Sequence, residues 1–146
     1  MRTIKYFLAS FAVAAALLPA AAKAADDVDL LLVLAVDVSR SIDAAKFQMQ
    51  REGYAAAVAD PRVIEAIQSG QTGRIGLSLV EWSGVGAQKV VIDWMAISDA
   101  NSAKGFGDHL LEAPRSFADR TSISGAIEFS MDQFSHAPLP LRSAAR

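Results

Sequence analysis

The chain has 146 residues with 14 basic and 16 acidic side chains, a formal net charge of -2 and no cysteine. The lack of cysteine excludes disulfide bonds, thiol catalysis and thiolate metal sites. Without a stripe rich in Lys and Arg, the composition gives no electrostatic reason to expect nucleic acid or an anionic membrane surface as a partner.

The first residues have the three parts of a secretory signal peptide. Arg2 and Lys5 form a basic start, residues 7–22 are almost wholly apolar, and small residues around Ala24 offer a cleavage site after that residue. The apolar part is shorter than the roughly 20 residues of a spanning helix, so we expect no stable membrane insertion after cleavage. The sequence therefore predicts a signal peptide over residues 1–24, a periplasmic or secreted location, and one small mature domain.

The segment Leu30 to Ser41 (LLLVLAVDVSRS) is an apolar run that ends in polar residues. An aliphatic run of this length is typical of a strand buried on both faces of a parallel sheet. Asp37, Ser39 and Ser41 then follow where the strand leaves the sheet, at the edge where α/β sheets bind ligands. They supply only oxygen ligands, which hard cations such as Mg²⁺ prefer.

The rest of the chain alternates helical and strand patterns, which predicts an α/β domain over residues 25–135. Helical spacing covers residues 43–59, a short stretch that ends near Gly70, and residues 99–113 and 122–134, while residues 74–82 and 88–94 have the β-branched and aromatic content of strands. A helical crossover separates the first two strands, so we expect them to be parallel, with the third as an antiparallel edge strand. Residues 136–146 carry two prolines and no strand pattern, which predicts an unstructured or aberrant tail.

The segment DVSRS at residues 37–41 matches the DxSxS motif of the metal ion-dependent adhesion site (MIDAS) in von Willebrand factor type A (vWA) domains. Thr121, followed by Ala126-Ile127, resembles the second metal loop of that family. The resemblance covers roughly residues 28–134. More narrowly, DVSRSI, QREGYAAA, VEWSG and RTSISGAI together resemble an uncharacterised bacterial secreted branch, a domain of unknown function. The resemblance implies a Rossmann-like, three-layer α/β/α fold.

The resemblance also implies a role for each site residue. Ser39 and Ser41 would bind Mg²⁺, Mn²⁺ or Ca²⁺ through their hydroxyls, Thr121 would bind directly or according to conformational state, and Asp37 would bind directly or hold metal-bound water. An open coordination position could then accept an exposed Asp or Glu carboxylate of a protein partner. Glu81 ends the second strand at the same face, as a candidate for supporting a ligand. The implied function is an exported protein-binding module and not an enzyme.

The chain departs from the family pattern after its last predicted helix. A complete vWA domain continues with three further strands on the other side of the first, and its fourth strand ends in another metal-site aspartate, a position that neither Asp119 nor Asp132 matches. We interpret the chain as a truncated or frame-shifted product, with PLPLRSAAR in place of the next strand. With one carboxylate fewer, metal affinity is expected to be weak. The first strand is expected to expose a long apolar edge that favours self-association.

Other interpretations stay open at this point. Ser41 or Asp43, and likewise residues 121–122, can be nothing more than helix N-caps. Asp37 at the end of a parallel strand can be the nucleophile of a phosphohydrolase-like enzyme, although phosphatase families of that kind usually carry a second acid where this chain has Ser39. A truncated fragment can also be without function.

Overall fold

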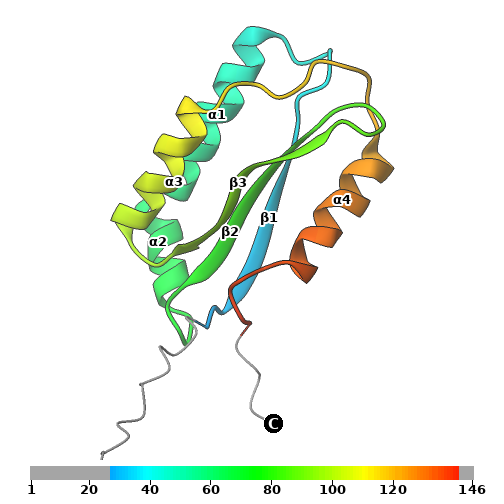
Figure 1. Cartoon of the computed structure of the whole chain (residues 1–146). Coiled ribbons are helices and arrows are strands. Elements are labelled where there is room, and N and C mark those ends of the chain that lie inside the picture. Colours follow the sequence, from blue (N-terminus) through cyan, green and yellow to red (C-terminus); the bar gives the residue numbers. More distant parts are fainter. Residues whose placement is uncertain (1–26, 142–146) are drawn as a thin grey trace, which may run out of the picture.

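The computed structural model describes residues 27–141, which form a three-stranded mixed sheet and four helices (Figure 1). The elements follow in the order β1 (Leu30–Asp37), α1 (Ala44–Val58), α2 (Pro61–Gln68), β2 (Ile75–Trp82), β3 (Gln88–Ile97), α3 (Ala100–Glu112) and α4 (Ile123–Ser135). None of these helices has the length and apolar character needed to cross a bilayer. The predicted signal peptide and the last residues of the predicted tail lie outside the described residues.

The sheet has the order β1-β2-β3, with β1 parallel to β2 and β3 antiparallel to β2. This topology confirms the predicted Rossmann-like α/β class and the antiparallel third strand. β3 continues to Ile97, beyond the predicted end at Trp94. Because β1 and β2 are parallel and in register, Asp37 lies opposite Trp82 where both strands end. The loops that follow these two strands therefore leave the sheet at the same edge.

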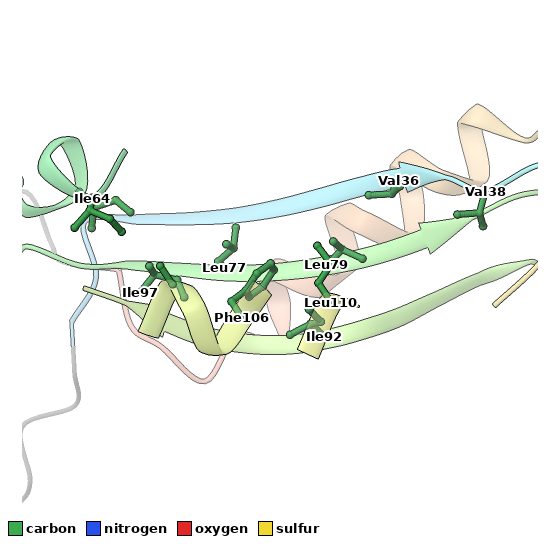
Figure 2. Close-up of a cluster of buried hydrophobic side chains, with 11 residues drawn as sticks. Val36, Val38, Ile64, Leu77, Leu79, Ile92, Ile97, Phe106 and Leu110 are labelled. Carbon is green, nitrogen blue, oxygen red and sulfur yellow. The ribbon is translucent and has the colours of Figure 1, made fainter. Parts of the chain in front are cut away.

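The helices lie in two layers, with α1, α2 and α3 on one face of the sheet and α4 on the other (Figure 1). The main core lies between the sheet and the first of these layers (Figure 2). Its largest fully buried apolar side chains are Leu77 of β2, Ile97 of β3, and Phe106 and Leu110 of α3, with Leu79 of β2 packed beside them. This core fixes the position of β2, whose end carries part of the candidate site.

β1 is more exposed than the sequence predicted. Val36 is the one buried residue of the strand, while Leu30 and Leu32 are 49% and 38% exposed. The prediction of a strand buried on both faces is wrong, because β1 lies at the edge of the described sheet and α4 buries only Ala126 against that side. The expectation of an exposed apolar edge is confirmed for the described residues.

The segment after α4 also differs from the prediction of an unstructured tail. The backbone N–H of Val28 donates to the carbonyl oxygen of Pro140 at 3.0 Å, and Val28 forms an isolated parallel bridge with Leu141. Val28 is fully buried. The physical reason is that an edge strand offers unpaired backbone groups, and a returning segment can satisfy one of them.

We predict that the purified chain associates through β1, because an open aliphatic edge without lysine or proline is a template for strand pairing. Leu32→Lys places a charge on this edge at a partly exposed side chain, and is expected to lower the association constant about tenfold or more. Met49→Lys, at a position of α1 that is 71% exposed, is the matched control. Sedimentation velocity over a concentration series measures the effect. A wild-type chain that stays monomeric at every concentration contradicts the prediction.

Candidate functional site

The loop that follows β1 brings three predicted site residues together. Oδ1 of Asp37 accepts a hydrogen bond from the backbone N–H of Ser39 at 2.7 Å, which fixes the orientation of the carboxylate. The hydroxyl oxygens of Ser39 and Ser41 are 3.3 Å apart. Ser39 is buried and Ser41 is exposed, so the pair spans the boundary between the interior and the surface.

Asp43, and not Ser41, is the residue of this loop that caps the N-terminus of α1. The carboxylate of Asp43 accepts a hydrogen bond from the backbone N–H of Lys46 at 2.9 Å, at the start of α1. This hydrogen bond holds the pKa of Asp43 below its usual range. Because Asp43 supplies the cap, the hydroxyl of Ser41 is not consumed by capping and stays beside Ser39.

Ser83, directly after β2, holds the loop between α3 and α4 against the end of the sheet. Its hydroxyl accepts a hydrogen bond from the backbone N–H of Asp119 at 3.0 Å and donates to the carbonyl oxygen of Arg120 at 3.1 Å. Its carbonyl oxygen accepts from the N–H of Ser122 at 2.8 Å. Ser83 is fully buried, so these bonds are shielded from water. Ser83 was not among the predicted site residues, because its only signal in the sequence is its place in the VEWSG segment.

Thr121 lies in this same loop, between two residues whose backbones are bonded to Ser83. The loop also contacts the β1 loop, because the N–H of Arg40 donates to the carbonyl oxygen of Asp119 at 2.8 Å. Thr121 is exposed, and within the described residues no hydrogen bond joins its side chain to the two serines or to the carboxylate of the β1 loop. Ser122 occupies the N-cap position of α4 without a side-chain capping bond. The structure therefore places Thr121 at the predicted edge of the sheet, in a separate loop.

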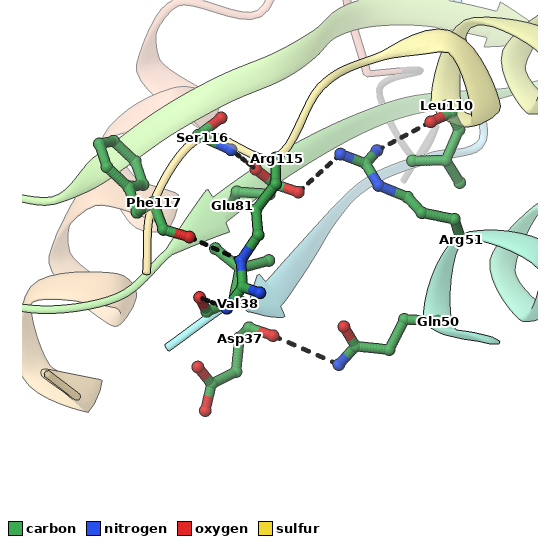
Figure 3. A network of polar contacts seen from close by, with 9 residues as sticks. All are labelled: Asp37, Val38, Gln50, Arg51, Glu81, Leu110, Arg115, Ser116 and Phe117. Atoms are coloured by element: carbon green, nitrogen blue, oxygen red, sulfur yellow. Dashed lines mark hydrogen bonds and ion pairs between the residues drawn. The ribbon is translucent and has the colours of Figure 1, made fainter. Parts of the chain in front are cut away.

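Glu81, near the end of β2, belongs to a buried ion pair (Figure 3). Its Oε1 accepts from Nη2 of Arg51 at 2.6 Å, and its Oε2 accepts from the backbone N–H of Ser116 at 2.7 Å. Nη1 of Arg51 donates to the carbonyl oxygen of Leu110 at 3.0 Å. The two ion-pair side chains are 0% and 4% exposed, and burial lowers the pKa of Arg51, an effect that the Glu81 charge opposes. Both oxygens of Glu81 are thus committed to holding α1, α3 and the loop after α3 together.

Arg115 links the loop after α3 to the β1 loop. Its Nη2 donates to the carbonyl oxygen of Val38 at 2.6 Å, and its Nε donates to the carbonyl oxygen of Phe117 at 2.7 Å (Figure 3). The same Nη2 also donates to the carbonyl oxygen of Ser39 at 2.9 Å. The guanidinium carbon lies 5.5 Å from the centre of the Phe47 ring. Arg115 was not among the predicted site residues, because a single arginine in a polar segment carries no periodic or motif signal.

The donor set of the β1 loop fits a hard divalent cation. Neighbouring ligands of an octahedral Mg²⁺ ion lie about 2.9 Å apart, close to the separation of the two serine hydroxyls. Oδ2 of Asp37 has no hydrogen bond or ion pair to the described residues, so it is free to face an ion or its water. No cluster of three or more His, Cys, Asp or Glu side chains is found in residues 27–141. A cation here would therefore depend on one carboxylate and neutral hydroxyls, which favours weak binding.

Comparisons with known proteins identify a family whose function is unknown. A family model described as "Protein of unknown function (DUF1194)" matches residues 27–144. An uncharacterized protein from Alicyclobacillus acidocaldarius subsp. acidocaldarius DSM 446, whose crystal structure is solved, is 22% identical with a TM-score of 0.46. The match covers 77% of this chain and 43% of that chain, so the present chain spans less than half of that protein. No curated protein matches.

We predict that Glu81→Gln lowers the free energy of unfolding by about 3 to 5 kcal/mol, because it leaves the charge of Arg51 buried without a carboxylate. Adding Arg51→Met to this variant removes the unpaired charge and is expected to recover part of the loss. Lys104→Met is the control, since it breaks an exposed ion pair with Asp108 and should cost less than about 1 kcal/mol. Urea unfolding gives all three values. Equal decreases in the free energy of unfolding for Glu81→Gln and Lys104→Met would contradict the prediction.

Proposed function

The chain belongs to the DUF1194 family of proteins of unknown function, and we propose that it is an exported, vWA-like binding module in which a divalent metal ion captures a carboxylate of a protein partner. The observation that carries this proposal is the 3.3 Å separation of the Ser39 and Ser41 hydroxyls beside the oriented carboxylate of Asp37. Oxygen donors in this arrangement match the preference of Mg²⁺ for a compact octahedral shell, with Mn²⁺ and Ca²⁺ as alternatives.

Each site residue has a proposed role that follows from its side-chain chemistry. The hydroxyls of Ser39 and Ser41 would hold the ion, Asp37 would bind it or its water, and Thr121 would add a ligand from the loop that Ser83 anchors. A bound ion would supply a position that accepts an anionic oxygen. Since hydroxyl ligands are neutral, most of the positive charge of the ion would stay available to an exposed Asp or Glu of the partner.

Glu81 contributes indirectly in this proposal. Its carboxylate binds Arg51 and the N–H of Ser116, so it supports the loop that carries Arg115 and Thr121 and does not bind the ion. The signal-like residues 1–24 support export, although they lie outside the described residues. The acidic balance of the chain supports a protein partner in preference to nucleic acid.

Isothermal titration of the purified chain with MgCl₂ tests the metal site. We expect a dissociation constant of about 10⁻⁴ to 10⁻³ M, the range of weak oxygen-ligand sites. Ser39→Ala is expected to weaken binding about tenfold or more, because it removes a ligand, whereas Ser124→Ala on the exposed side of α4 is the matched control and should leave it unchanged. A wild-type chain that binds no Mg²⁺, Mn²⁺ or Ca²⁺ would contradict the proposal.

A second measurement separates binding from catalysis. An immobilised glutamate-rich peptide is expected to retain the chain in Mg²⁺, to release it in EDTA, and not to retain Ser39→Ala. Turnover of p-nitrophenyl phosphate that disappears in Asp37→Asn would instead assign an enzymatic role to Asp37 and contradict a pure binding module.

A further inference from the structure

Several backbone groups of the β1 loop form hydrogen bonds to other segments of the chain. The N–H of Val38 donates to the carbonyl oxygen of Trp82 at 2.9 Å, and the N–H of Arg40 donates to that of Asp119 at 2.8 Å. The carbonyl oxygens of Val38 and Ser39 both accept from Arg115. Val38 and Ser39 are buried, at 0% and 1% exposure, so water does not readily replace these partners.

We propose that Arg115 is a positioning residue of the Asp37 loop, fixing which oxygen atoms the loop presents to a ligand. This inference rests on the function proposed above. Backbone carbonyls are themselves good ligands of hard cations. Arg115 occupies the carbonyl of Val38 and shares the carbonyl of Ser39 with the N–H of Ile42, so the hydroxyls of Ser39 and Ser41 remain as the oxygens available beside Asp37.

The guanidinium can do this because it is itself restrained on several sides. Nε donates to the carbonyl oxygen of Phe117, and the ring of Phe47 lies 5.5 Å from the guanidinium carbon. The next residue, Ser116, is fixed through its N–H by the buried carboxylate of Glu81. Arg115 therefore acts as a rigid connection between the buried ion pair and the β1 loop.

The geometry of the side chain matters more than its charge. Within the described residues no carboxylate lies within ion-pair distance of Arg115, and all three of its hydrogen bonds end on backbone carbonyls. The planar guanidinium of arginine can donate to separate acceptors from Nε and Nη2 at the same time, whereas lysine has a single ammonium nitrogen that cannot reach all of these acceptors. Arg115→Lys should therefore behave as a loss of function although it keeps the positive charge.

Amide hydrogen exchange of the metal-free chain tests the positioning role without any ligand. In Arg115→Lys and Arg115→Met we expect the amides of Arg40 and Ile42, both hydrogen-bonded in the wild-type loop, to exchange about tenfold faster or more. Arg62→Met removes an exposed arginine on α2 and is the control. Urea midpoints establish that each variant is folded, and Arg115→Lys serves alone if Arg115→Met does not fold.

Titration with MgCl₂ gives the second measurement. The Arg115 variants are expected to bind Mg²⁺ about 10- to 100-fold more weakly than the wild type, the usual effect of losing a group that orients metal ligands. Unchanged exchange in folded Arg115→Lys, or wild-type Mg²⁺ affinity in that variant, overturns the inference. If the wild type binds no metal, the proposed function fails, while faster loop exchange in Arg115→Lys still supports the positioning role.

Discussion

The buried ion pair of Arg51 and Glu81 is the interaction that holds together the elements at the edge of the sheet where β1 and β2 end. Removing two charges from water is costly, and the cost is offset only when the remaining hydrogen-bonding capacity is largely satisfied. Here the two side chains bind each other, the carbonyl of Leu110 and the N–H of Ser116, and Nε of Arg51 is the one polar atom of the pair left buried without a hydrogen-bond partner among the described residues. One polar cluster thereby fixes α1, the end of β2, the last turn of α3 and the loop that follows it.

Two polar side chains beyond that cluster, Arg115 and Ser83, hold the loops of the candidate site; Arg115 adjoins the cluster through the N–H of Ser116, and Ser83 follows β2 directly. Each makes several hydrogen bonds to backbone groups of the loops around the site. Directional bonds of this kind fix the positions of loop atoms more narrowly than apolar packing does. An arrangement of hydroxyls around Asp37 is therefore a property of three loops together and not of the DxSxS segment alone.

Hydrophobic pattern was sufficient to predict the topology, because the crossover between β1 and β2 and the hairpin to β3 are set by segment lengths and turns. The same pattern gave a wrong prediction for the burial of β1. An aliphatic run indicates a strand, but it does not show how many strands or helices pack against that strand, and Leu32 is partly exposed at the edge of the sheet. The loop residues from Asp37 to Ser41 could be located by their position after the strand. Arg51, Glu81 and Arg115 could not be connected, since they meet only in the folded chain and no local spacing links them.

The edge position of β1 has a consequence for folding order. β2 and β3 form a local hairpin, whereas β1 pairs with β2 only after two intervening helices have closed the chain between them, which is the slower contact to form. Val36 is the one buried residue of β1, so we expect this strand to open locally at a lower free energy than β2. A ligand that bound Asp37 only in the docked strand would have an apparent affinity that scales with the docked fraction, and its binding would in turn favour docking.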